Sequence, residues 1–239
     1  MIPAYNEEKL LPRLLDTVDE ARRCYPEGTE EIEVVVSNNG STDRTAEVAS
    51  ARGCRIAEVE KRIIGAVRNG GARIARGKVL SFVDADARLH PETFLEIDEV
   101  LSDPRILAGT SGVRLERWSL GIAATFAFMY PVVLFTQIDT GVLFCYAEDF
   151  DEVGGFDERR QFGEDMAFMW ALKHLGRQRG QALRRLRRAK SIFSLRKFDE
   201  FGDWHYITHM WRFIQPMFAD PDARSEFADR YWYADDRKD

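Results

Sequence analysis

Residues 79–86 read VLSFVDAD, an apolar run that ends on two aspartates separated by one alanine. The run lacks the polar alternation of a half-exposed strand, so it predicts a strand buried on both faces, as in a parallel sheet covered by helices. Open α/β sheets bind their ligands beyond the carboxyl ends of the strands. Because residues two apart on an extended chain point to the same side, Asp84 and Asp86 are expected to face one cleft together.

Apolar runs alternate with helical patterns around this strand, which predicts a mostly parallel central sheet flanked by helices. The run IEVVV at 32–36 predicts a strand before the turn pair Asn39-Gly40, and a helix follows with Ser41 or Thr42 as its N-cap. Further strands are expected at 54–60, 106–115 and 138–146, and further helices at 65–77, 91–101 and 166–176.

The composition is that of a folded globular protein. The 239 residues are 45% hydrophobic and 12% aromatic, which suits one large domain with an embellishment. We assign residues 1–198 to a single α/β domain and residues 199–239, rich in aromatic side chains, to a helical C-terminal extension. A net charge of -6 from 34 basic and 40 acidic residues favours no nucleic-acid partner.

The cysteines and the first residues bear on the compartment. The three cysteines lie far apart without a CxxC pair, which is typical of a reducing compartment, and MIPAYNEEKL lacks the apolar core of a signal peptide. We therefore expect a cytoplasmic protein.

Two segments leave contact with the inner face of a membrane open. The apolar stretch at 120–136 contains Gly121 and Pro131 and is shorter than the ~20 residues of a spanning helix, so a buried or interface helix is the main expectation. The segment 173–190 holds eight Lys and Arg and no acid. It predicts a solvated helix end and edge strand, or contact with a phosphate-bearing acceptor or an anionic lipid surface. The oligomeric state is left open too.

The Asp84-Ala-Asp86 motif has two interpretations. Two carboxylates at a strand end are suitable ligands for Mg²⁺ or Mn²⁺ bridging phosphates, whereas the structural alternative is an exposed turn. The predicted helix at 65–77 contains Gly65, Gly70 and Gly71, although each glycine costs roughly 1 kcal/mol in a helix interior. Either something approaches that backbone closely or part of it is a loop, and Arg68 beside it either reaches a phosphate or is solvated.

Glu164 and Asp165 occupy the first turn of a predicted helix. The helix dipole favours negative charge there, so a purely structural role is one alternative and a general base at a cleft is the other. His205 and His209 are four residues apart but lack the glutamate of a zinc-protease motif. The absence of GxGxxG, P-loop and GxSxG motifs argues against a dinucleotide oxidoreductase, a P-loop NTPase and an α/β-hydrolase.

The order of the motifs is more specific than any one of them. The succession IPAYNEE, VVVSNNGSTDRT, GAVRNGGARIARG, FVDAD, VGGFDE and GED resembles glycosyltransferase family 2, the inverting nucleotide-sugar transferases of GT-A fold. The resemblance covers roughly residues 2–170 and continues loosely through SLRKF at 194–198. It implies a Rossmann-like GT-A domain that moves a hexosyl or N-acetylhexosaminyl group from a UDP- or GDP-sugar to a hydroxyl acceptor.

The resemblance also implies roles for individual residues. The donor's base and ribose would lie beside Pro3, Ala4, Tyr5 and Glu7, with the base received by the loop around Asn38. Arg68 would lie near the diphosphate. Asp84 and Asp86 would form the metal motif, with Asp86 the direct ligand of Mg²⁺ or Mn²⁺. Asp165 would be the catalytic base with Glu164 beside it, and Thr140 and Gly141 would line the acceptor side.

Two departures from the family pattern keep other functions open. The family commonly has aspartate where Asn38 stands, and its first strand usually has several more apolar residues than Met1-Ile2 provides. A non-catalytic sugar-nucleotide or glycan-binding module of the same fold is therefore the alternative function. A nucleotidyltransferase would need a Gly-rich basic loop where this chain has YNEEK.

Overall fold

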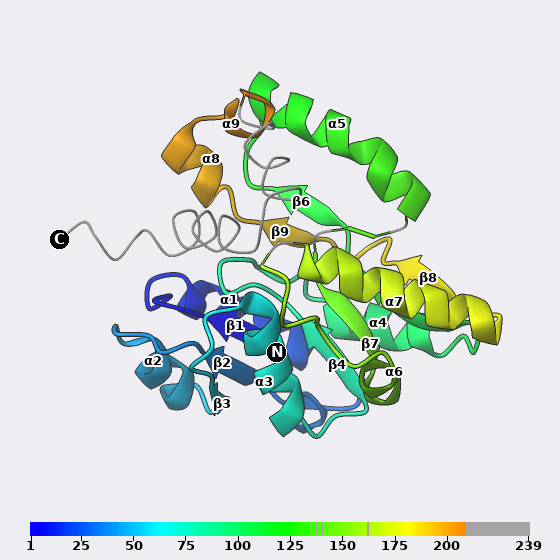
Figure 1. The fold of residues 1–239 in the computed structure, drawn as a ribbon. Helices are drawn as coiled ribbons and strands as arrows, with labels where there is room; N and C mark the ends of the chain where they lie inside the picture. The colour runs from blue at the N-terminus through cyan, green and yellow to red at the C-terminus, as the bar shows by residue number, and fades with distance from the viewer. Residues whose placement is uncertain (137, 140, 162, 209–239) are drawn as a thin grey trace.

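The computed structural model describes residues 1–136, 138–139, 141–161 and 163–208 (Figure 1). One part of its central sheet contains the parallel strands β1 (Ile2–Ala4), β2 (Val35–Asn38) and β3 (Arg55–Glu58), with β2 in the middle. The other part contains, in spatial order, β4 (Val79–Phe82), β7 (Leu143–Tyr146), β5 (Ile106–Thr110) and β8 (Ala182–Arg185).

Two backbone hydrogen bonds join these parts into one layer. The amine of Met1 donates to the Ser81 carbonyl at 2.5 Å, and the Val83 N–H donates to the Met1 carbonyl at 3.1 Å. The order is therefore β3-β2-β1-β4-β7-β5-β8, in which β7 is antiparallel to both of its neighbours. The prediction of a mostly parallel sheet is confirmed.

Helices cover both faces of this layer. On one face α1 (Leu11–Arg23), α2 (Thr45–Ala51) and α4 (Thr93–Leu101) pack on Ile2, Val36 and Val83. On the other, α6 (Ala147–Glu152) and α7 (Glu164–Arg179) pack on Leu80 and Phe82. A short 3-10 helix, η1 (Thr29–Glu31), precedes β2. The inner strand β7, with the sequence LFCY, is almost wholly apolar because both faces of the sheet are covered there.

The glycine-rich segment is helical from Ile64 to Ile74 (α3), so no part of that range is a loop. A Cβ on Gly71 would lie 2.4 Å from the Ser37 hydroxyl, and one on Gly70 would lie 2.4 Å from a methyl of Val59. The close approach that the glycines predicted is therefore made by the sheet itself, which lets α3 pack tightly against β1 to β3.

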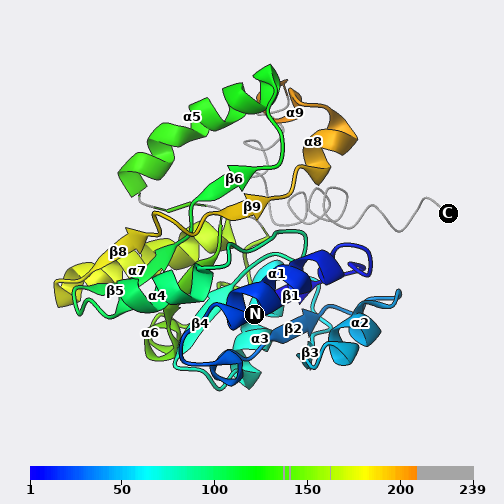
Figure 2. The same cartoon turned by 180° about the vertical axis from the view of Figure 1, so that it is seen from behind.

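A smaller unit stands apart from the central sheet, as Figures 1 and 2 show. It comprises the parallel pair β6 (Val113–Leu115) and β9 (Ser191–Phe193) with the helices α5 (Leu120–Thr136), α8 (Arg196–Phe201) and α9 (His205–Thr208). The expected strand at 106–115 is two strands in two sheets, because the chain leaves the central sheet at Ser111–Gly112. Helix α8 crosses the expected boundary at 198/199, and residues 209–239 lie outside the described residues.

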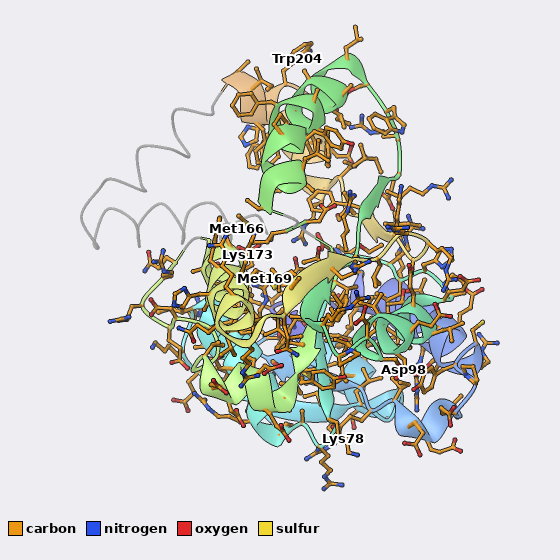
Figure 3. The ribbon with its side chains drawn as sticks, turned by 90° about the vertical axis from the view of Figure 1, so that its right-hand side faces the viewer. Lys78, Asp98, Met166, Met169, Lys173 and Trp204 are labelled. Carbon is orange, nitrogen blue, oxygen red and sulfur yellow. The ribbon has the colours of Figure 1, made fainter. Side chains whose placement is uncertain are left out.

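Helix α5 is buried on one side only. Ile122 is fully buried against Leu115, Leu195 and Phe198, whereas Leu120 is 83% exposed. Figure 3 shows this unit projecting from the rest of the molecule, with Trp204 near its far end. Within the described part of the chain, no helix combines the length and the apolar character that crossing a bilayer requires.

The basic segment 173–190 is partly neutralised within the chain. Arg179 pairs with Asp149 at 2.6 Å, Arg185 with Asp139 at 2.7 Å, and Arg188 with Glu99 at 2.5 Å. Lys173 donates to the Thr136 carbonyl at the end of α5. Several of these cations therefore serve to connect elements.

The first strand begins inside the molecule. A cavity of about 230 Å³ adjoins Met1. Its lining includes apolar residues such as Val34 and Val79 and charged residues such as Glu33 and Lys78. Burial of the Met1 amine lowers its pKa to about 5.

Candidate active site

A cavity of about 350 Å³ opens at the carboxyl ends of β1 and β4. Nine of the residues singled out from the sequence line it: Pro3, Ala4, Tyr5, Glu7, Arg68, Asp84, Asp86, Glu164 and Asp165. Asn38 and Gly141 are not among its described lining residues, and Thr140 lies outside the described residues. Elements far apart in the chain thus meet where the sheet topology predicts a ligand.

The two motif aspartates follow directly after β4. Ala85 between them is 4% exposed and packs in the core, and the Ala87 N–H closes the turn on the Asp84 carbonyl at 3.0 Å. The Asp84 side chain is 53% exposed and that of Asp86 23% exposed. Burial, and then the neighbouring Asp84, raise the pKa of Asp86 above its usual range. The buried alanine therefore anchors two carboxylates at the cavity.

Arg68 on α3 connects the two acidic motifs. Its Nη2 lies 2.9 Å from Asp84 Oδ1 and its Nη1 lies 2.5 Å from Glu164 Oε1, and its side chain is only 9% exposed. Burial disfavours the charged guanidinium, but Asp84 and Glu164 outweigh it and hold the pKa of Arg68 above its ordinary value. Arg68 is thus a fixed buried cation between two carboxylates.

Glu164 and Asp165 begin α7 after Gly163, whose φ of 64° is in the left-handed region. Glu164 is buried against Arg68, and burial raises its pKa. Asp165 is less buried, lines the cavity and accepts the Met166 N–H at 2.7 Å. The two acids therefore differ: Glu164 holds Arg68, whereas Asp165 faces the cavity.

The β1 end of the cavity contains an aromatic ring and a turn. The Arg62 guanidinium lies 5.0 Å from the centroid of the Tyr5 ring. The Asn38 side chain donates to Glu58 at 2.8 Å and accepts the Ser41 N–H at 3.2 Å, so it shapes the loop. Its neighbour Asn39 is the residue of this pair that lines the cavity.

One wall of the cavity was not predicted as part of the site. It is formed by the β9–α8 segment, with the lining residues Phe193, Ser194, Arg196, Lys197 and Phe198. Backbone hydrogen bonds between Arg88 and Ile192 attach this segment to the turn after Asp86. The stretch SLRKF at 194–198 was the available sequence signal, although nothing in it shows which residues it contacts.

Arg196 from this wall lies between two carboxylates. Its Nη1 is 3.1 Å from Glu7 Oε1, and its Nη2 is 3.8 Å from Asp86 Oδ2. Burial raises the pKa of Glu7 to about 7. Each aspartate of the motif therefore has an arginine partner, Arg68 for Asp84 and Arg196 for Asp86.

The acidic side chains at the cavity determine whether a divalent cation fits there. Among the described residues, no group of three or more His, Cys, Asp or Glu side chains could hold a metal ion. Asp84 and Asp86 nevertheless offer hard oxygen ligands at a cavity that a phosphate could enter. Because Mg²⁺ usually takes one or two carboxylates together with phosphate oxygens, this pair fits a cation bound jointly with a diphosphate.

Comparison with solved structures identifies the fold. The structure of S. aureus TarS 1-349 in complex with UDP-GlcNAc has a TM-score of 0.63 and 19% identity, over 80% of this chain and 56% of that chain. The mannosyltransferase PcManGT from Pyrobaculum calidifontis, in complex with GDP-Man and Mn²⁺, has a TM-score of 0.63 and 20% identity, over 81% and 55%. At these identities the likeness concerns the fold, which is GT-A.

Comparison with curated sequences finds shorter matches. Validoxylamine A glucosyltransferase of Streptomyces hygroscopicus subsp. limoneus is 39% identical over 98 residues, which are 38% of this chain and 21% of that protein. Dolichyl-phosphate beta-glucosyltransferase of Drosophila melanogaster is 38% identical over 96 residues, 36% of this chain and 29% of that protein. The matched region thus spans less than a third of either relative.

The family model for glycosyl transferase family 2 matches residues 1–126, more than half of the chain. The matched range includes β1, β2, the α3 helix with Arg68 and both motif aspartates. By sequence and by fold, the chain belongs to glycosyl transferase family 2.

Proposed function

We propose that this protein transfers a sugar, with inversion, from a nucleotide diphospho-sugar to a hydroxyl acceptor, and that it uses Mg²⁺ or Mn²⁺. The observation that carries the proposal is the convergence of Asp84, Asp86, Arg68 and Asp165 on one cavity at the end of the sheet. TarS with UDP-GlcNAc and PcManGT with GDP-Man and Mn²⁺ support a UDP- or GDP-sugar as the donor class.

The nucleoside would lie at the β1 end of the cavity. Tyr5 offers an aromatic face there, and Asn39 offers polar groups beside it. Pro3 and Ala4 also line the cavity, and their small side chains would leave room for the ribose. The buried Arg68 would face the diphosphate, since a guanidinium suits phosphate oxygens and cannot lose its charge at neutral pH.

Asp84 and Asp86 would hold the cation, with Asp86 the closer ligand. A divalent cation held by these carboxylates would supply positive charge to neutralise the negative charge that grows on the leaving group. Asp84 and Arg68 already attract each other at 2.9 Å, so the same pair would keep the turn in place beside the phosphates.

Asp165 would act as the general base. In a single displacement the acceptor oxygen forms a bond to the anomeric carbon while the bond to the phosphate oxygen breaks, and its electron pair leaves with the nucleoside diphosphate. The acceptor's proton passes to the Asp165 carboxylate. Glu164 cannot share this task easily, because it is buried and paired with Arg68.

The test is turnover of UDP-glucose, UDP-GlcNAc and GDP-mannose with Mn²⁺, followed as release of nucleoside diphosphate. For UDP-α-glucose with water as acceptor, inversion predicts that β-glucose appears first in the proton NMR spectrum. Asp165→Asn should lower turnover by about 10²-fold or more while nucleotide affinity stays nearly unchanged. The exposed Asp98 on α4 provides the matched control Asp98→Asn, which should keep full turnover.

Two results would contradict the proposal. Release of α-glucose first would exclude inversion, and near-normal turnover in Asp165→Asn would exclude this base. Binding of a nucleotide sugar without turnover under any of these conditions would instead support the non-catalytic binding module.

A further inference from the structure

The two arginines at the cavity differ in how firmly they are held. Arg68 is 9% exposed and lies in the middle of α3, between Asp84 and Glu164. Arg196 is 39% exposed and stands at the start of α8, a helix of six residues in the smaller unit. Arg68 is therefore fixed, whereas Arg196 has room to change partners.

The contacts of Arg196 are unequal. The distance to Glu7 is 3.1 Å, a hydrogen-bonded ion pair, whereas the distance to Asp86 is 3.8 Å, an ion pair too long for a hydrogen bond. Asp86 is therefore neutralised by Arg196 but is not tied to it.

We propose that Arg196 is an exchanging cation of the donor site: it neutralises Glu7 and Asp86 when the site is empty and moves to the diphosphate when donor and divalent cation bind. This inference rests on the proposed donor site. A divalent cation at Asp86 repels the guanidinium at a distance of a few ångströms, whereas the diphosphate brings oxygens that match its planar fork.

The exchange would also explain why Glu7 lies in the site. Glu7 is 11% exposed in its side chain, and its Oε1 lies closer to the Arg196 guanidinium than Asp86 does. A carboxylate at this position retains the arginine beside the cavity whether or not Asp86 is engaged. Because Arg196 is the first residue of α8, its movement to the diphosphate would couple the smaller unit to donor binding.

The proposal predicts opposite effects on two ligands. Arg196→Gln removes the cation that competes for Asp86, so affinity for Mn²⁺ alone should rise by about 3–10-fold. It also removes a charge-assisted contact to phosphate, so affinity for UDP or GDP with Mn²⁺ should fall by about 10–100-fold. The affinity for UMP and GMP, which lack the second phosphate, should fall less in Arg196→Gln.

A structural role of Arg196 would predict a different result. If the residue only fastened α8 to the end of β1, Arg196→Gln would weaken the binding of both ligands and lower the thermal midpoint. Arg196→Lys keeps the charge without the fork. It should bind Mn²⁺ alone as the wild type does and lose only part of the UDP or GDP affinity.

The matched control is Arg117→Gln. Arg117 belongs to the same unit, pairs with the two carboxylates of Asp199 and Asp203 at 2.6 and 2.7 Å, and is not among the described lining residues of the cavity. Its substitution loosens the unit without touching the site, so neither Mn²⁺ nor nucleotide affinity should change. The same changes in Arg117→Gln as in Arg196→Gln would overturn the proposal.

The experiment is isothermal titration calorimetry of the full chain with Mn²⁺ alone, and with UDP, GDP, UMP and GMP in the presence of Mn²⁺. A wild type that binds no nucleotide would refute the proposed function itself. A wild type that binds UDP or GDP, with an Arg196→Gln variant whose Mn²⁺ affinity is unchanged or weaker, would refute the exchange alone. Opposite changes for Mn²⁺ and diphosphate would establish it.

Discussion

Arg68 shows at the scale of one residue how the site is stabilised. The sequence places it among glycines, next to a helix backbone that something approaches closely, but gives no partner for it. In the structure Arg68 has two carboxylate partners, Asp84 and Glu164. Its ion pair with Glu164 is buried, since each of these two side chains is only 9% exposed. A buried ion pair adds little net stability, yet breaking it by removing one partner is costly.

We therefore predict that Arg68→Met lowers the free energy of unfolding by about 3–5 kcal/mol, because Glu164 is left buried without its counter-ion. The double variant Arg68→Met/Glu164→Gln should recover part of this loss. Arg73→Met is the matched control on the same helix, since the Arg73 side chain is 67% exposed and its ion pair should contribute at most about 1 kcal/mol. Urea unfolding of the variants measures all three, and equal losses in Arg68→Met and Arg73→Met would contradict the account.

The site residues differ in how far the sequence alone could predict them. Asp84, Asp86, Glu164 and Asp165 were predicted because each stands in a local motif at the end of a strand or the start of a helix. The pair between Arg196 and Glu7 joins residues 189 positions apart, and no local pattern carries that information. The loop around Asn38 was predicted to receive the base, and the hydrogen bond of the Asn38 side chain to Glu58 on the neighbouring strand is likewise a contact that no local pattern indicates.

At the scale of one element, β1 is the shortest of the three parallel strands at its end of the sheet. It pairs with β2 over only Ile2–Ala4, and the Met1 amine is buried beside a cavity of about 230 Å³. The amine has a pKa of about 5 in the folded protein against an ordinary value of 8.0, so the folded state disfavours its protonated form. Folding at intermediate pH must release that proton, which opposes stability.

The sign of the pH dependence follows. Between pH 5 and 8 the unfolded chain binds the proton and the folded chain does not, so this group makes stability rise with pH, by about 4 kcal/mol across the window. Glu7, whose pKa rises to about 7 on folding, acts in the opposite direction between pH 4.5 and 7. A comparison that keeps Glu7 constant is therefore needed.

We compare the 239-residue chain with a variant that has three apolar residues added before Met1. The addition replaces the amine by a neutral amide and should extend β1 into the cavity. The extended chain should be the more stable, and its advantage should be greater at pH 5 than at pH 8. Chemical unfolding of both proteins at the two pH values measures this advantage. An advantage that does not change with pH would contradict this account, because it would mean that folding does not lower the pKa of the Met1 amine.

Other elements differ from expectation for physical reasons. The run 106–115 looks like one strand because it is apolar throughout, but the turn at Ser111–Gly112 sends its second half into another sheet. The stretch 120–136 was expected to be a buried or interface helix, and α5 is indeed a helix buried on one side. Its uniform apolar composition gave no periodicity from which the buried side could be predicted.

At the scale of the whole molecule, the smaller unit completes a site that the central sheet begins. The sheet supplies the carboxylates and Arg68, whereas β9 and α8 supply the facing wall with Arg196. The mostly parallel sheet could be predicted from the alternation of strands and helices, because each unit is local in sequence. The position of the smaller unit could not, because it depends on contacts such as those of Arg88 with Ile192.

The central claim is that this cavity binds a nucleoside diphosphate together with a divalent cation at the motif aspartates. The most direct measurement is the thermal midpoint of the protein with UDP, GDP, CDP and dTDP, each with and without Mn²⁺, for the wild type and Asp86→Asn. At about 100 times the dissociation constant, one nucleotide should raise the wild-type midpoint by roughly 5–10 °C, from ~2.7 kcal/mol of binding linkage, only with Mn²⁺ and much less in Asp86→Asn. No shift with any nucleotide, or an equal shift in Asp86→Asn, would contradict it.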